Sequence, residues 1–349
     1  MYRIKTVTIL IVSANLFLSS RMLGQKPEFQ FSLQSWLSYT TYDQYDSTGT
    51  TLEETTTQLG FGIRRARLRG TMTRGKFIGF VQYDVATSAF TDAQLDYLLS
   101  DHLKLRMGRF VGPGSQAAGR TSHTVLDFTE RGIVGRLYSI AVGRDDHRSY
   151  GMSLIGKVSF LNYEIMASNG DGSLSLKPYN TKSSNSDEDT GFVPQMDFMV
   201  YSKITKGLSG GIHCGLPSEK RINVSALTGY LYFQPADYKK GDLRGKLDLV
   251  HITDETEALS VSSLGYRMLA FYRVMHNMEI GIQYEQWDPN TDLEKDTFGN
   301  ITVGLNYSPN PDHWKDTLFK LAATFKTSQA PNQPYDPLVI HAMWQLYMH

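Results

Sequence analysis

The 349-residue sequence predicts an all-β fold, a transmembrane antiparallel β-barrel of about 16 strands. Short segments such as 301–307 alternate apolar and polar residues, and this period of two places one set of side chains on each face of a strand. The connections between such segments alternate between short turns and long polar stretches, which is typical of outer-membrane barrels. The last segment, 338–348, is predicted to close the barrel, which leaves no open sheet edge in lipid.

The first 25 residues are predicted to be a secretory signal peptide. A start with Arg3 and Lys5 precedes the apolar run 6–18, and small and polar residues follow. These are the three parts of a signal peptide, and the run is shorter than the roughly 20 apolar residues that a membrane-spanning helix needs. We therefore expect export, with residues 26–349 as the barrel domain.

The exported part divides into sixteen predicted strands, with fourteen and eighteen as open alternatives. Residues 26–349 provide about 20 residues for each strand with its connection, which suits barrel strands of about 10 residues. The predicted strands are 28–41, 57–72, 76–87, 92–99, 102–111, 148–157, 158–168, 193–204, 208–215, 222–233, 243–253, 263–274, 278–287, 299–307, 317–326 and 338–348.

The long connections are expected at one rim of the barrel and the short ones at the other. Short ones are predicted at 73–76, 99–102, 156–159, 206–208 and 275–277. Long ones are predicted at 43–56, 111–148, 169–191, 254–262, 288–300 and 327–337. This asymmetry separates a membrane barrel from a soluble sandwich, whose strands also alternate.

The composition excludes several other classes of protein. The 35 Lys and Arg against 35 Asp and Glu form no basic footprint, which argues against nucleic-acid binding. The single cysteine excludes an internal disulfide and any multi-cysteine metal site. A mean hydropathy of −0.31 fits a barrel, because only the lipid-facing half of each strand must be apolar.

Three stretches of the chain carry recognisable motifs. The first is Phe61–Gly70 (FGIRRARLRG), leading into Phe77–Asp84; the second is Leu103–Phe110 with Pro113 and Leu126–Arg131 (LDFTER); the third is Tyr284–Asn290 (YEQWDPN), followed by Thr302–Tyr307. In this order they resemble the phosphate-selective porin O and P family of outer-membrane channels. Together they bracket nearly the whole exported chain.

The resemblance implies a sixteen-stranded barrel, commonly a trimer, that passes small solutes and often anions. It also implies that the third loop, here Val111–Arg148, folds into the barrel and narrows the pore. Well-studied members of the family carry a central group of lysines, and this loop has no such group. The resemblance therefore does not extend to phosphate selectivity.

Three arginines of the second predicted strand are candidates for an anion pathway. Arg65, Arg67 and Arg69 share one face of the strand, and Ala66 and Leu68 share the other. An arginine on the lipid face at mid-bilayer costs about 2–4 kcal/mol, so these three should point into the lumen. Stacked guanidinium groups there favour anions. The alternative is that lumenal carboxylates neutralise them, so that they only stiffen the wall.

Lys104 and Arg106 point inward by the same alternation and are also assigned to the anion pathway. Further inward bases are predicted at Arg244, Lys246, Lys320 and Lys326, and inward acids at Asp84, Asp96, Glu164, Asp248, Glu279 and Glu285. With the arginines of the second strand included, nine bases face six acids. We therefore expect a weak preference for anions.

Five charged residues assigned to the inward-folding loop are candidates for the constriction. They are Arg109, Arg120, Asp127, Glu130 and Arg131. Opposed acids and bases at a constriction create a transverse field that selects solutes by charge and dipole. The alternative is that Asp127, Glu130 and Arg131 pair with the barrel wall and only fasten the loop.

Together these features predict a passive, water-filled porin in the bacterial outer membrane. Its expected partners are small solutes or anions, phosphate among them, with membrane lipid around a homotrimer. We expect no catalytic residue, cofactor or metal, because the sequence has no G-x-S-x-G motif and no recognisable cluster of serine, histidine and acid. Two alternatives stay open: an outer-membrane lipase or protease built on a barrel, and an adhesin that uses loops 43–56 and 169–191.

Overall fold

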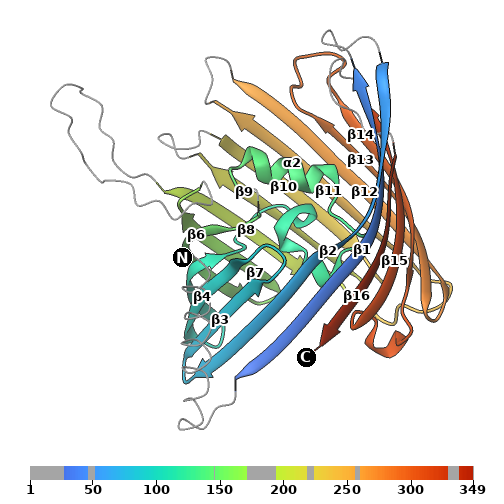
Figure 1. Ribbon diagram of the computed structural model, residues 1–349. Coiled ribbons are helices and arrows are strands. Elements are labelled where there is room, and N and C mark those ends of the chain that lie inside the picture. Colours follow the sequence, from blue (N-terminus) through green and yellow to red (C-terminus); the bar gives the residue numbers. More distant parts are fainter. Residues whose placement is uncertain are drawn as a thin grey trace, which may run out of the picture.

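The computed structural model describes residues 27–45, 52–144, 146–170, 194–217, 224–255, 260–328 and 338–348. Within these ranges sixteen strands form one closed antiparallel barrel, in which each strand pairs with its neighbours in sequence and β1 pairs with β16 (Figure 1). The closing pair runs from Phe31 opposite Met348 to Thr40 opposite Val339. The predicted fold class and strand number are confirmed. The predicted signal peptide lies outside the described residues.

The observed strands overlap the predicted ones throughout. They are β1 (Glu28–Tyr45), β2 (Leu52–Arg74), β3 (Phe77–Asp84), β4 (Ala89–Ser100), β5 (Leu103–Phe110), β6 (Ser149–Val158), β7 (Leu161–Ser168), β8 (Gln195–Lys203), β9 (Leu208–Leu216), β10 (Val224–Phe233), β11 (Leu243–Asp254), β12 (Val261–Met275), β13 (Met278–Asp288), β14 (Phe298–Tyr307), β15 (Thr317–Ser328) and β16 (Leu338–Met348). The largest difference is at the predicted loop 43–56. The β1–β2 pairing extends into this stretch at Asp43–Tyr45 and Leu52–Thr56, where Tyr45, Thr55 and Thr56 are residues that favour strands.

The strands carry apolar side chains on the outside and polar ones on the inside. In β12, Leu264, Met268 and Tyr272 are exposed, whereas Arg267 and Arg273 are buried. A barrel surrounded by lipid needs this order, which is the reverse of a soluble protein. In the part of the chain that the structure describes, no helix is long and apolar enough to cross a membrane.

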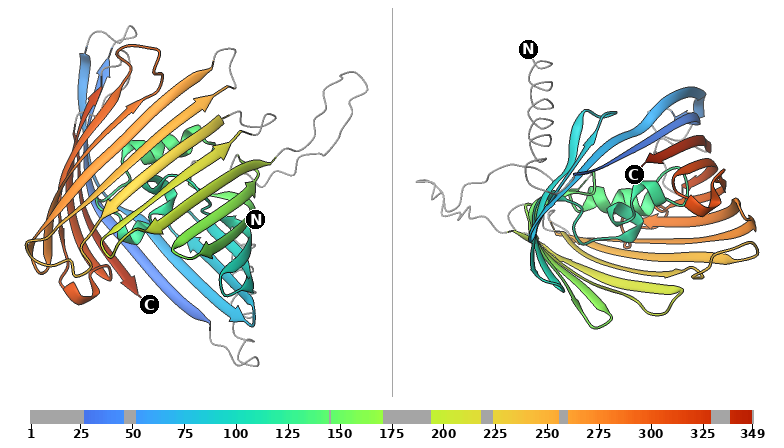
Figure 2. Two further views of the ribbon diagram at one scale, coloured as in Figure 1. Left: turned by 180° about the vertical axis from the view of Figure 1, so that it is seen from behind. Right: turned by 90° about the horizontal axis from the view of Figure 1, so that it is seen from below.

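The connection between β5 and β6, residues 111–148, lies inside the ring of strands (Figure 2). It contains the helical turns η2 (Gln116–Arg120) and η3 (His123–Val125) and the helix α2 (Ile133–Ala141). We call this segment the inward loop. The inward folding implied by the family resemblance is therefore observed.

The apolar core lies between the inward loop and one side of the barrel. Val134 of α2 packs with Val250 of β11 and Trp287 of β13, where the inward positions are apolar instead of polar. Phe128 of the loop packs on Phe271 of β12, with ring centroids 4.9 Å apart. Burial of these side chains directs the loop toward the β10–β15 side of the wall.

Candidate functional site

Ion pairs around Asp127 fasten the middle of the inward loop to the wall. Its carboxylate accepts bonds from Arg244 (2.5 Å) and Lys246 (2.8 Å) of β11. Lys320 of β15 donates to loop carbonyl groups on either side of Asp127. Burial alone would raise the pKa of Asp127, but the charges of Lys246 and Arg244 outweigh burial and hold that pKa well below its usual value. The ionised Asp127 therefore has the fastening role that the sequence left open.

The segment from α2 onward is also tied to the wall. At the start of α2 the backbone N–H of Ile133 donates to the carboxylate of Glu285 of β13 (3.0 Å), because the first N–H groups of a helix have no partner within it. Beyond its end, Arg144 binds Asp197 of β8, and His213 of β9 contacts the same carboxylate (2.9 Å). The loop is thus held on the β8–β15 side along much of its length.

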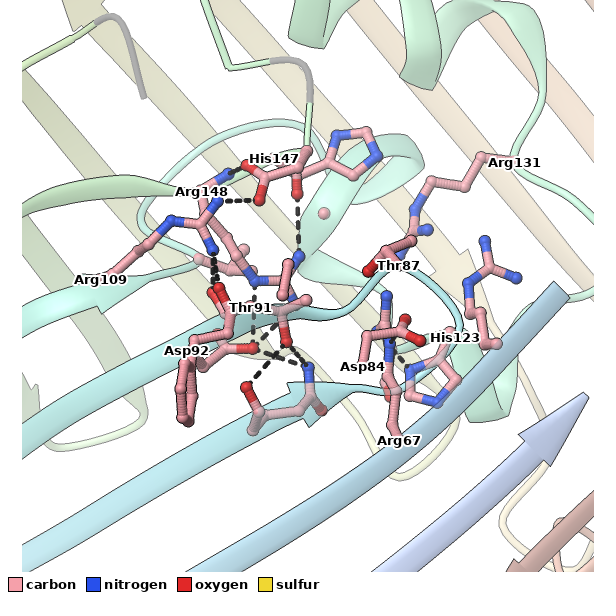
Figure 3. Close-up of a pocket in the computed structure, with 18 of the residues that line it drawn as sticks. Arg67, Asp84, Thr87, Thr91, Asp92, Arg109, His123, Arg131, His147 and Arg148 are labelled. Atoms are coloured by element: carbon pink, nitrogen blue, oxygen red, sulfur yellow. Dashed lines mark hydrogen bonds and ion pairs between the residues drawn. The ribbon is translucent and has the colours of Figure 1, made fainter. Parts of the chain in front are cut away.

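A polar pocket of about 810 Å³ lies on the other side of the inward loop, against β2, β3 and β4 (Figure 3). Its charged lining residues are Arg64, Arg65, Arg67, Arg69, Arg109, Arg120, Arg131, Arg136 and Arg148, with Asp84, Asp92, Glu130 and Asp146. Nine guanidinium groups thus face four carboxylates. We call it the arginine pocket, and its excess of positive charge attracts anions.

The structure places all three arginines predicted on the inner face of β2 in this pocket. Arg67 binds the carboxylate of Asp84 of β3 (2.8 Å), as the neutralised alternative supposed. Arg69 instead binds the side-chain oxygen of Gln82 (2.5 Å). Neighbouring positions with the same predicted orientation, Arg65 among them, therefore differ in how much of their charge is left for a solute.

A fourth arginine of β2 enters the pocket because of a β-bulge that the alternation did not predict. The β1–β2 register shifts between Gln34 and Ser35, so that Arg64 is an extra residue of β2. A bulge inserts one extra residue into a strand, so the side chains on its two sides no longer alternate in step. Arg64 and Arg65 both pair with Glu130 of the inward loop. Glu130 therefore fastens the loop to β2.

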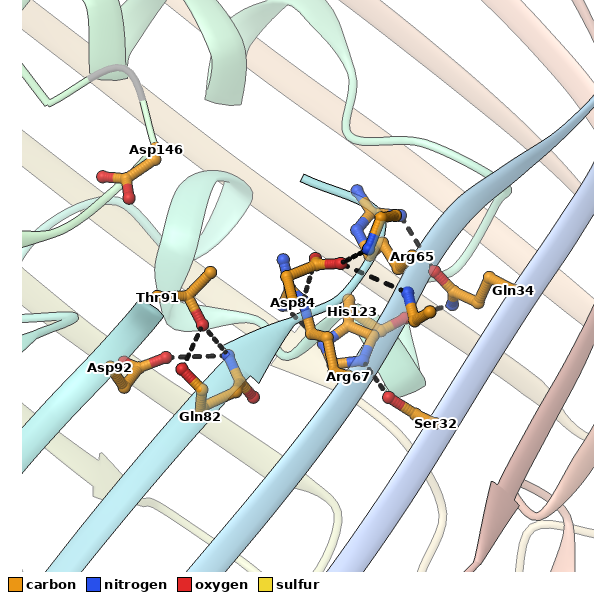
Figure 4. Close-up of polar contacts among 12 residues, drawn as sticks. Ser32, Gln34, Arg65, Arg67, Gln82, Asp84, Thr91, Asp92, His123 and Asp146 are labelled. Atoms are coloured by element: carbon orange, nitrogen blue, oxygen red, sulfur yellow. Dashed lines mark hydrogen bonds and ion pairs between the residues drawn. The ribbon is translucent and has the colours of Figure 1, made fainter. Parts of the chain in front are cut away.

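His123 of η3 holds two of the arginines in place (Figure 4). Its Nδ1 accepts bonds from Arg67 (3.0 Å) and Arg69 (3.4 Å), because a guanidinium group can only donate, and its Nε2 donates to the Ser32 hydroxyl (3.0 Å). Burial, together with the charges of Arg67 and Arg69, lowers the pKa of His123 far below its usual value. The neutral ring thus orders the arginines without adding charge.

Two residues assigned to the anion pathway do not line the arginine pocket. Lys104 and Arg106 point inward as expected, but both pair with Asp96 of β4 (2.8 and 2.7 Å). Because the single carboxylate of Asp96 is shared by these two bases, part of their positive charge is not compensated. This charge lies on the inner wall, outside the arginine pocket. The alternation predicts the direction of these side chains correctly and says nothing about their partner.

The arginines assigned to the loop have three different positions. Arg109 belongs to β5, because the β5–β6 pairing continues through Phe110, so its assignment to the loop is wrong. Arg120 pairs with Glu164 of β7 (2.7 Å). Arg131 donates to two carbonyl groups of the loop (2.8 and 2.7 Å) and therefore fastens the loop to itself, not to the wall.

Sequence reasoning missed several further residues of the pocket. Besides Arg64 the ionisable ones are Asp92, His123, Arg136, Asp146, His147 and Arg148. Arg148 pairs with Asp92 (2.9 Å), and Asp146 pairs with Arg109. The available signal was the run of ionisable residues at 144–148 (RDDHR), at the end of a loop that was expected to fold inward.

No protein-family model and no curated protein matches the sequence. Solved structures match over 93% of this chain at low identity. The anion-selective porin from Comamonas acidovorans is 14% identical, with a TM-score of 0.61 over 100% of that chain. The trimer form of OmpT, an outer membrane protein of Vibrio cholerae, is 13% identical, with a TM-score of 0.59 over 99% of that chain. OmpF of Salmonella typhi, in complex with daunomycin, is 12% identical, with a TM-score of 0.56 over 98% of that chain.

This chain has the fold of bacterial outer-membrane barrels. The likeness extends to porin structures in general, and the narrower resemblance to the porin O and P family stays a prediction. Within this barrel, Arg69, Arg131 and Arg136 form no ion pair with any described residue. Arg136 is exposed on α2 and lines the arginine pocket. These three guanidinium groups are the ones best able to meet an anion in the lumen.

Proposed function

We propose that the protein is a porin of the bacterial outer membrane that lets small solutes diffuse through its lumen and prefers anions. The observation that carries this proposal is the arginine pocket, where nine arginines face four carboxylates beside the inward loop. Basic side chains that line a water-filled passage favour anions. Phosphate is one of the anions proposed to pass, and the proposed channel has no catalytic role.

The fold supports this proposal. The matching structures include an anion-selective porin, and OmpT was solved in a trimer form, which supports a homotrimer as the proposed assembly. The adhesin alternative rested on loops 43–56 and 169–191. Most of the first is strand in the structure, and nearly all of the second lies outside the described residues.

Ion selectivity in planar bilayers tests the proposal. Across a gradient of potassium chloride, the reversal potential should shift toward the equilibrium potential of chloride. A shift toward that of potassium would overturn the anion preference. Lipid or peptide hydrolysis without any conductance would instead support the enzyme alternative.

Two arginines of the pocket can be replaced without depriving any described carboxylate of an ion-pair partner. Arg69→Gln combined with Arg136→Gln should lower the ratio of chloride to potassium permeability, because neither arginine has an ion-pair partner among the described residues. A matched control is Lys157→Gln with Lys203→Gln, which removes the same charge from exposed ends of strands outside the pocket. Equal selectivity of both double variants would exclude the pocket from the pathway.

A further inference from the structure

We infer that the arginine pocket favours anions that also carry a hydroxyl group, such as 2-hydroxy carboxylates, and that the Nε2 atom of His147 recognises the hydroxyl. This inference rests on the proposed function, because it names the class of anion that the same pocket selects. Guanidinium groups only donate hydrogen bonds, so they satisfy a carboxylate and leave a solute hydroxyl proton without a partner.

The backbone of His147 is held in one position. Its φ angle of 66° is in the left-handed region, which non-glycine residues rarely adopt. Its N–H donates to the carbonyl of Arg144 (2.7 Å). On its other side lies Gly119, where an added Cβ would stand 2.3 Å from the Cβ of His147. The side chain therefore leaves the backbone at a defined place in the pocket wall.

Contacts of the ring determine which nitrogen carries the proton. The hydroxyl of Ser139 donates to the carbonyl of Gly135 one turn earlier in α2 (3.1 Å), so its proton is already engaged. The same hydroxyl contacts Nδ1 of His147 and must accept there. Nδ1 is therefore protonated, and Nε2 carries a lone pair.

The lone pair of Nε2 is available to a solute. His147 lines the arginine pocket, and Nε2 has no hydrogen-bond partner in the part of the chain that the structure describes. Figure 3 shows the ring between Arg148 and Arg131 in that view. Burial, with the charges of Arg131 and Arg148, lowers the pKa of His147 to about 3, so the ring is neutral near pH 7.

A neutral acceptor suits an anion better than a carboxylate does. The four carboxylates of the pocket repel anions, and each is paired with an arginine. An imidazole nitrogen accepts a hydroxyl proton without this repulsion. A solute carboxylate bound by the two-pronged guanidinium donors would place a neighbouring hydroxyl within reach of such an acceptor.

Lactate and propionate, which differ by one hydroxyl, provide the test. In planar bilayers with potassium lactate on one side and potassium propionate on the other, the wild-type channel should favour lactate about two- to tenfold beyond the ratio of their mobilities in water. This is the range of one net hydrogen bond. His147→Phe should abolish this preference. Ser139→Ala keeps the ring of His147, but either ring nitrogen can then carry the proton. This variant should therefore reduce the preference for lactate, and it can be measured even if His147→Phe does not fold.

The control is Lys157→Gln with Lys203→Gln, which should keep the wild-type ratio of lactate to propionate. A wild-type channel that prefers chloride to potassium but does not distinguish lactate from propionate would overturn this inference alone. An unchanged ratio in both His147→Phe and Ser139→Ala would do the same. Absence of chloride preference in the wild type would overturn the proposed function, and the inference with it.

Discussion

The histidines of the inward loop show how the arginine pocket sets the state of individual residues. His123 and His147 are both neutral, because burial and the surrounding arginines disfavour a charged ring. Each ring then uses its two nitrogens differently, since one donates and the other accepts. In His123 the acceptor holds arginines, and in His147 it faces the lumen.

Acid should destabilise the folded barrel through these two rings. The pKa of His147 is about 3 in the folded chain, against a usual value of 6.5. Below pH 6.5 the unfolded chain therefore binds more protons, so the contribution of the neutral ring is complete above pH 6.5 and is lost as the pH falls toward 3. Urea unfolding in lipid vesicles should show a lower midpoint at pH 4.5 than at pH 7.

The control for this prediction removes the titrating rings. His123→Gln with His147→Asn keeps polar side chains, and asparagine tolerates the left-handed backbone of residue 147. Its midpoint should fall less between pH 7 and pH 4.5 than that of the wild type. An equal fall would assign the acid sensitivity to the carboxylates instead.

Asp127 and Asp146 are both paired in the inward loop, but their burial differs. Asp127→Ala should lower the free energy of unfolding by about 3–5 kcal/mol, because it removes a carboxylate partner from the buried Arg244 and from the partly buried Lys246. Asp146 is exposed (43% of its side chain), so Asp146→Ala should cost less than about 1 kcal/mol. Urea unfolding of the two variants measures the difference. Equal losses of stability would show that Asp127 does not fasten the inward loop to the wall.

At the scale of elements, the inward loop is a packed unit and not a flexible strap. Gly135 lets α2 approach η2, since an added Cβ would stand 2.2 Å from the backbone oxygen of Ala117. The same helix covers inward apolar positions of β10 and β11. The position of the pocket thus depends on contacts between two short elements and one side of the wall.

Gly135→Ala should push α2 away from η2. We expect a loss of about 1–3 kcal/mol in the free energy of unfolding, since the backbone cannot yield cheaply. The gain in helix propensity, about 1 kcal/mol, offsets only part of this. Single-channel conductance should change as well, because Arg136 is the next residue of α2. Gly60→Ala, where nothing lies within 4 Å of the new Cβ, is the control and should change neither quantity.

At the scale of the whole molecule, the barrel is a single closed sheet that separates an apolar outer environment from a polar lumen. Each strand of the described wall exposes at least one large apolar side chain, and the inner face is a network of ion pairs around the inward loop. Closure between β1 and β16 completes the hydrogen bonding that lipid cannot supply.

The outer face predicts a sharp response to charge. Val303 lies in the middle of β14, paired with Ile282 and Ala323, and 40% of it is exposed on the outside. Val303→Arg should lower the free energy of unfolding in lipid vesicles by about 2–4 kcal/mol. Val303→Leu should be close to neutral. A tolerated arginine would mean that this face does not contact the hydrocarbon region.

The sequence by itself determined the barrel and the direction of most wall side chains, and of the strand numbers it left open, the favoured sixteen is the one observed. Alternation is a local property, because each residue follows its neighbour to the opposite face whatever lies around it. For this reason Arg65, Arg67 and Arg69 were placed on the inner face from their spacing alone. The inward loop came from a family resemblance, and four of its nine charged residues were identified, namely Arg120, Asp127, Glu130 and Arg131.

Only the tertiary structure decided where the pocket lies and which charges remain available in it. The bulge that admits Arg64 depends on the register of β1 against β2, and Arg67 differs from Arg69 because Asp84 stands across from it. His123 acquires its role from arginines of β2 that are far away in sequence, and His147 acquires its role from Ser139 of α2 and from the charge of Arg131, which the folded loop brings beside it. Such pairings depend on distances between segments that meet only after the barrel has closed, and a local pattern does not contain them.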